Sequence, residues 1–143
     1  MAAAESVCAR DGARLTPLRR RVLELVWNSH RPALAYELLD RLREERARAA
    51  PPTVYRALEF LMARGLVHRI ESMNAYVGCN MPGEPHTGQF LICDDCKTVA
   101  EMDHDDIDAL IARHARRSGY IPARQTVEVH GRCQHCAGDA GAS

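Results

Sequence analysis

The sequence predicts an α+β protein with two domains, an N-terminal winged helix-turn-helix and a small C-terminal α/β domain that carries paired cysteines. Charge is divided between the halves. Residues 1–78 hold 13 arginines and 9 acidic residues, a net +4, whereas residues 79–143 hold 6 basic and 10 acidic residues, a net −4. All cysteines except Cys8 lie at or after Cys79. Two prolines and two glycines in residues 80–88 indicate a linker. We therefore expect domains at 1–79 and 89–143, joined by a hinge at 80–88.

Three segments of the first half, residues 15–29, 33–47 and 50–65, carry apolar residues at helical spacing. Thr16 is a suitable N-cap with Pro17 at the first helical position. A double proline precedes the third segment, and Gly65 is suited to end it in the left-handed conformation. Residues 66–79 are typical of two short strands around a turn. Three short helices followed by a hairpin form the winged variant of the helix-turn-helix.

The second half is expected to contain strands at 89–93 and 98–102, a helix at 106–119 and a strand at 123–131. The tail from Ala137 is small and polar, and we expect it to be frayed. The N-terminus lacks the basic and apolar regions of a secretion signal, and no apolar run is long enough to span a membrane. A cytosolic location is therefore expected, where thiols stay reduced.

The third helical segment is the candidate for contact with DNA. Its apolar stripe faces the core, so the polar residues of its first turns point elsewhere, where a recognition helix reaches base edges. Arginine suits guanine, and tyrosine suits a phosphate or the thymine methyl group. Arginines on the first helix would meet backbone phosphates. The candidate contacts are Thr53, Tyr55, Arg56 and Arg19, with Arg20 and Arg21 beside Arg19. The alternative is a plain helical domain with a solvated arginine face. A net charge of +4 is modest, so a dimer would be needed to double the contacts.

Two cysteine pairs of the same spacing, Cys93 with Cys96 and Cys133 with Cys136, stand thirty-six residues apart. Four thiolates around Zn²⁺ form a closed tetrahedral site, which is structural rather than catalytic. A redox dithiol would need a low-pKa cysteine at a helix N-terminus. Neither pair is expected to be followed directly by a helix, so the pattern favours structural zinc over a redox centre or disulfides.

A second candidate ligand set consists of His68, Cys79, His86 and Glu101. Each is an accepted zinc ligand type, but no local spacing links them. Taken singly, the His and Glu residues are ordinary surface groups and Cys79 is an ordinary small core residue. Their positions in the hairpin, the linker and the second half would join the two domains through one ion.

Four stretches resemble the ferric uptake regulator family, and within it the zinc uptake regulators most. They are "LTPLRRRVLELV", "PPTVYRALEFLMARGLVHRIES", "HTGQFLICDDCKTVAE" and "VEVHGRCQHC", and the likeness runs from about Leu15 to Cys136. The resemblance implies a bacterial, cytoplasmic, homodimeric repressor with a C-terminal dimerisation domain. It also implies that zinc acts as corepressor on palindromic operators of zinc uptake genes. No enzymatic activity is expected, because the chain shows no nucleophile motif and no cofactor loop.

The resemblance implies two zinc ions per chain. Cys93, Cys96, Cys133 and Cys136 match the structural site of the family, and His68, Cys79, His86 and Glu101 match the regulatory site of its zinc branch. Tyr55 and Arg56 match the recognition pair of that branch.

Alternatives remain open at this point. A family member that senses iron, manganese or peroxide is one, although the histidine-rich run of the iron branch is missing before Cys93. A zinc enzyme or a thiol-redox protein is another. Some relatives carry a third metal site with a histidine eight residues before the last cysteine pair. Gln125 occupies that position here, so we expect no third site, and we interpret His104 as part of a solvated, acidic helix start.

Overall fold

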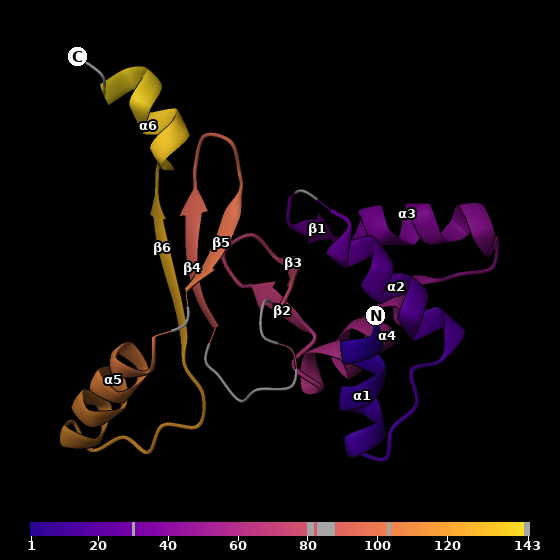
Figure 1. The fold of residues 1–143 in the computed structure, drawn as a ribbon, viewed down its shortest axis with the longest axis horizontal. Helices are drawn as coiled ribbons and strands as arrows, with labels where there is room; N and C mark the ends of the chain where they lie inside the picture. The colour runs from indigo at the N-terminus through magenta and orange to yellow at the C-terminus, as the bar shows by residue number, and fades with distance from the viewer. Residues whose placement is uncertain (30, 80–81, 83–87, 103, 142–143) are drawn as a thin grey trace. The chain divides into compact units, whose positions relative to one another are not determined.

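The computed structural model describes residues 1–29, 31–79, 82, 88–102 and 104–141. The chain divides into two compact units, Met1–Glu84 and Pro85–Ser143 (Figure 1). Each unit combines helices with a three-stranded sheet, which confirms the α+β fold class. The expected hinge, residues 80–88, lies almost entirely outside the described residues, so its role stays a prediction. Within the described part of the chain, every helix is too short or too polar to cross a membrane.

The three helices expected in the first unit are confirmed with slightly narrower bounds: α2 (Pro17–Trp27), α3 (Ala35–Glu45) and α4 (Pro51–Ala63). Thr16 caps α2, because its Oγ1 accepts a hydrogen bond from the backbone N–H of Arg19 at 3.3 Å. The Glu37 carboxylate accepts the backbone N–H of Leu34 at 3.0 Å at the start of α3. Gly65 follows α4 with a φ of 69°, a left-handed conformation that glycine adopts without a steric penalty.

A further helix, α1 (Ala2–Arg10), was not expected. Its buried residues are Ala4, Val7 and Cys8, too small to form the stripe of large apolar side chains that marks an amphipathic helix. Its alanines nevertheless favour helix intrinsically. Burial raises the pKa of the Cys8 thiol, which agrees with Cys8 as an unreactive core residue.

The hairpin expected at 66–79 consists of β2 (Val67–Ile70) and β3 (Ala75–Gly78), paired antiparallel from Val67 opposite Gly78 to Ile70 opposite Ala75. Asn74 stands in the turn with a φ of 49°. A two-residue strand, β1 (Ala33–Leu34), pairs with the other edge of β3. The order β1-β3-β2 completes the winged helix. The unit is held together by a core of fully buried aliphatic side chains, among them Leu23, Leu42, Leu58, Leu61, Leu66 and Ile70.

The second unit contains a sheet of order β5-β4-β6. Its strands are β4 (Gly88–Cys93), β5 (Val99–Met102) and β6 (Thr126–Gly131), with β4 antiparallel to β5 and parallel to β6. The crossover between β4 and β6 contains α5 (Asp105–Arg117). The last helix, α6 (Gln134–Gly141), follows β6. Within this unit α5 lies beyond the end of the sheet where β6 begins, and α6 beyond the opposite end (Figure 1). The expectation of a frayed tail from Ala137 is therefore wrong as far as Gly141.

One buried amide ties the crossover helix to the sheet. Gln89 of β4 is fully buried. Its Nε2 donates to the His104 carbonyl at 3.0 Å and to the Asp108 carboxylate at 2.8 Å. Its Oε1 accepts the backbone N–H of His104 at 3.3 Å. Both donors and the acceptor of the side chain are therefore satisfied, which is the condition for burying an amide at little cost.

Replacing Gln89 by leucine should destabilise the protein by about 1–3 kcal/mol, because the three hydrogen bonds of its buried amide to His104 and Asp108 would be lost. The unfolding midpoint in chemical denaturant measures the effect. Gln125→Leu is a matched control, because its Oε1 is buried without a hydrogen-bond partner among the described residues. The control should not lower the midpoint. Equal losses in both variants would contradict the role given to the Gln89 network.

Candidate metal centres and nucleic-acid surface

The four paired cysteines meet at one end of the second sheet. Cys93 ends β4, Cys96 stands in the turn after it, Cys133 follows β6 and Cys136 lies in α6. Their Sγ atoms all lie within 4.8 Å of one another, and those of Cys96 and Cys133 are 3.8 Å apart. Thiolates at about 2.3 Å from a tetrahedral zinc ion would be about 3.8 Å apart. The arrangement therefore fits a four-coordinate zinc ion with no open position.

Backbone N–H groups turn toward these sulphur atoms. Cys93 Sγ accepts from the N–H groups of Cys96 at 3.5 Å and Cys133 at 3.4 Å. These donors lower the pKa of the Cys93 thiol to about 6. The pKa of Cys136 moves the other way, to about 12, because hydrogen bonds with the sulphur atoms of Cys133 and Cys93 favour its protonated thiol. A divalent cation removes this conflict, since all four ligands can then be thiolates.

The two cysteine turns are also fastened to each other. Arg132 donates from Nε to the Asp95 carboxylate at 2.8 Å and from Nη2 to the Cys136 carbonyl at 3.2 Å. The backbone N–H of Asp94 donates to the Gly131 carbonyl at 2.7 Å. These contacts orient the ligand-bearing turns independently of the sulphur atoms, as outer contacts of metal sites commonly do.

The expectation that no helix directly follows a cysteine of either pair is wrong. The helix α6 begins at Gln134, directly after Cys133, and contains Cys136. The absence of a helix therefore cannot serve against a redox dithiol. The convergence of all four sulphur atoms replaces that argument, because a dithiol redox centre needs only two of them.

The residues of the second expected ligand set come from both units, and one of them lies outside the described residues. His68 lies half-buried on β2, and Cys79 is buried directly after β3. A ring nitrogen of His68 and Cys79 Sγ lie within 4.8 Å of each other, so the first unit presents two ligand atoms together. Glu101 is half-buried on β5 of the second unit. His86 lies outside the described residues. This set stays a prediction.

The expected recognition helix is α4. Its buried residues include Val54, Leu58 and Leu61, as the apolar stripe predicts. Tyr55 is 44% exposed, Arg56 is exposed and Thr53 is half-buried, all in the first two turns. Among the described residues no acidic group pairs with Arg56. The first turns of α4 therefore present an aromatic hydroxyl and an uncompensated cation to the solvent.

The arginines of α2 have partners within the first unit that the sequence does not predict. The Arg19 guanidinium carbon lies 3.7 Å from the centroid of the Phe60 ring of α4, and its Nη1 donates to the Arg14 carbonyl at 2.8 Å. Arg20 pairs with Glu5 of α1. Such contacts leave part of each guanidinium for another partner, so contacts of these arginines with phosphate stay predictions.

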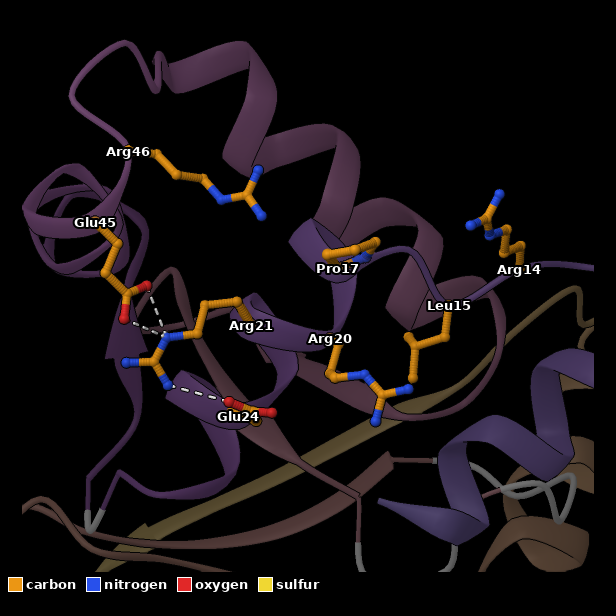
Figure 2. A pocket seen from close by; sticks show the side chains of 8 residues that line it. All are labelled: Arg14, Leu15, Pro17, Arg20, Arg21, Glu24, Glu45 and Arg46. Carbon is orange, nitrogen blue, oxygen red and sulfur yellow. Dashed lines mark hydrogen bonds and ion pairs between the residues drawn. The ribbon is translucent and has the colours of Figure 1, made fainter.

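Arg21 lines a pocket of about 680 Å³ beside the first turn of α2 and the end of α3 (Figure 2). It is held there by two carboxylates, Glu45 at 2.8 Å and Glu24 at 3.1 Å. Arg14 and Arg46 also line the pocket, and neither forms an ion pair with a described residue. These two cations were not singled out from the sequence, because Arg14 precedes the first expected helical segment and Arg46 stands at the very end of the second.

Comparison with known proteins identifies the family. A sequence model described as the ferric uptake regulator family matches residues 10–130. The chain belongs to this family. It is 42% identical to the zinc uptake regulation protein of Escherichia coli (strain K12) over 137 residues, which cover 95% of this chain and 80% of that protein.

Two solved structures are similar over nearly the whole chain. A zinc uptake regulator in complex with zinc and DNA superimposes with a TM-score of 0.92 at 40% identity, covering 99% of this chain and 95% of that chain. The holo form of XcZur superimposes with a TM-score of 0.87 at 48% identity, covering 93% of both chains. The family resemblance seen in the sequence, including its zinc branch, is thereby confirmed.

Lys97 closes the first cysteine turn with a φ of 64°, where its N–H donates to the Cys93 carbonyl at 2.9 Å. A left-handed conformation costs a residue with a Cβ about 1–2 kcal/mol. Lys97→Gly should therefore stabilise the protein by up to about 1 kcal/mol after the entropy of glycine is subtracted, and slow the loss of zinc to a chelator. Lys97→Ala removes the charge and keeps the strain, so it should give no such gain. Faster zinc loss from the glycine variant than from the alanine variant would contradict this account of the turn.

Proposed function

We propose that the protein is a zinc-responsive transcriptional repressor, which binds palindromic operator DNA as a homodimer when zinc occupies a hinge site and so represses zinc uptake genes. One observation carries the proposal. A chain whose four cysteine sulphur atoms fit a zinc ion is 42% identical, over 95% of its length, to a zinc uptake regulation protein. The protein would act on DNA in the cytoplasm, without enzymatic activity.

Two zinc ions per chain would have different tasks. The four-cysteine site is closed, so an ion there would serve the stability of the second unit. The regulatory ion would be held by His68, Cys79, His86 and Glu101. The proximity of His68 and Cys79 in the first unit supports this assignment. Because the set draws on both units, its formation would depend on their arrangement, which is what a sensor requires.

The ligand chemistry favours zinc over the other metals sensed in the family. The proposed site has four ligands, namely one soft cysteine thiolate, two imidazoles and one carboxylate. Iron and manganese sensing would instead favour harder oxygen and nitrogen ligands. Cys79 carries this distinction. A peroxide sensor that works by metal-catalysed oxidation would likewise want hard ligands at that position.

The second unit has the surface expected of a dimerisation domain. No residue of α5 is buried, and Leu110 and Ile111 on it are 46% and 38% exposed. Ile121, which follows the helix, is 94% exposed. A second copy covering this apolar surface would remove it from water and would double the DNA contacts made by residues 1–78, whose net charge is only +4.

Each recognition helix of such a dimer would enter a major groove, and successive grooves on one face of the duplex are about 34–36 Å apart. Occupation of the hinge site would favour the arrangement that matches this spacing. A ligand shifts such an equilibrium only through its different affinities for the two states. A shift from 1% to 99% competent requires about 5.5 kcal/mol, which is plausible for a ligand set completed in one arrangement only. Arg14 and Arg46, which form no ion pair with a described residue, would add contacts to phosphates.

Removal of one regulatory ligand tests the proposal. The purified protein should contain two zinc ions per chain, one that resists mild chelation and one that can be removed and restored. Cys79→Ala should lose the removable ion and the zinc-dependent gain in operator affinity, and keep the resistant ion. Cys8→Ala is a matched control, because Cys8 is also a buried cysteine of the first unit and is not a proposed ligand. Unchanged zinc-dependent binding in Cys79→Ala would refute the regulatory site.

The recognition helix is tested separately. Arg56→Ala should weaken specific operator binding by about 1–3 kcal/mol and relax the preference at one base pair. Binding titrations on the operator and on a random duplex at the same salt concentration measure the difference. An equal loss on both duplexes would show that Arg56 contacts phosphate rather than a base.

A further inference from the structure

The single tryptophan of the chain stands between α2 and the hairpin. Trp27 ends α2 and donates from Nε1 to the Leu66 carbonyl at 3.2 Å. Its ring lies directly over Gly78, the last residue of β3. A Cβ on Gly78 would stand 2.4 Å from Trp27 Cδ1 and 2.8 Å from Nε1, closer than real Cβ contacts allow. The indole therefore occupies the space that a side chain would otherwise fill at this position.

The backbone groups that Trp27 contacts are those that position Cys79. The Leu66 carbonyl also accepts the backbone N–H of Cys79 at 3.1 Å. Cys79 is the residue directly after Gly78, and His68 lies two residues after Leu66 on the paired strand. One indole thus fixes the carbonyl that binds the Cys79 backbone and the glycine that precedes it. The ligand atoms of His68 and Cys79 lie within 4.8 Å of each other. Both residues stand close to these contacts, His68 near the start of β2 and Cys79 directly after β3.

We infer that Trp27 is a positioning residue for the first-unit half of the regulatory zinc site. This rests on the proposed function, in which His68 and Cys79 bind the regulatory ion. The indole N–H holds the Leu66 carbonyl, and that carbonyl holds Cys79 at its distance from His68. Outer residues that orient metal ligands in this way raise affinity by pre-organising the ligand pair. The ring itself contributes no ligand atom.

Trp27→Phe tests the inference, because phenylalanine keeps an aromatic ring over Gly78 and removes the N–H donor. The affinity for the removable zinc, measured by competition with a chelator, should fall about tenfold or more. The chelator-resistant zinc should remain. Arg43→Gln is the matched control: it removes another side-chain contact to a backbone carbonyl of the same unit, Arg43 Nε to the Ala49 carbonyl at 3.0 Å, away from the ligand pair. It should leave the affinity unchanged.

The outcomes separate the inference from the proposed function. A wild-type affinity in Trp27→Phe overturns the role of Trp27 while the regulatory site stands. A wild-type protein without removable zinc overturns both. A thermal midpoint that falls equally in Trp27→Phe and Arg43→Gln, with affinity lost only in the former, supports positioning rather than a general loss of stability.

A second measurement needs no variant of Trp27. Zinc(II) has no absorption that would quench the indole directly, so a change in emission reports a change around the ring. Because the indole holds the ligand pair before the ion binds, the tryptophan emission of the wild-type protein should stay nearly constant when the removable zinc is restored. A large shift on restoring zinc would show that the ring takes its place only with the ion, which overturns pre-organisation by Trp27 even if Trp27→Phe does not fold.

Discussion

Four sulphur atoms that must meet within bonding distance of one ion constrain the whole second unit. Cys93 and Cys133 stand at the ends of two strands that are parallel neighbours, and thirty-six residues separate the two pairs along the chain. The intervening strand and helix have to return the chain to the same end of the sheet. The crossover therefore brings the cysteines together as well as completing the core. The core of this unit consists of few buried side chains, chiefly Phe90, Ile92 and Cys93.

The first unit is stabilised in a different way from the second. Its stability comes from a continuous apolar core of helices and hairpin, and several of its surface arginines are held by carboxylates or by an aromatic ring. Arg21 between Glu24 and Glu45 and Arg20 beside Glu5 are examples. Exposed pairs of this kind contribute little to stability. Their more relevant effect is on orientation, because a guanidinium held in place near α2 would meet a phosphate with less loss of side-chain freedom.

Much of this could be predicted from the sequence, and the reasons differ among elements. The helices α2 to α4 follow from wide apolar stripes, from Thr16 and from the prolines at helix starts, all local signals. The four-cysteine centre follows from repeated spacing. The helix α1 was missed because its buried residues are small, and α6 because its glycines suggest a loop while its start is held by the cysteine turn. The role of Gln89 and the position of Trp27 over Gly78 depend on residues far apart in the chain, which no local pattern shows.

The order in which the ligands are made has a consequence for a newly synthesised chain. Cys93 and Cys96 leave the ribosome well before β6 and the second cysteine pair. Until that pair is present, the emerging domain offers two thiols and an edge of β4 that has no parallel neighbour. The strand that covers β4 is complete at Gly131, but the metal centre can form only once the chain has been made as far as Cys136. Capture of the structural ion is thereby tied to the synthesis of the second cysteine pair, so chains that stop before Cys136 would compete poorly for the metal.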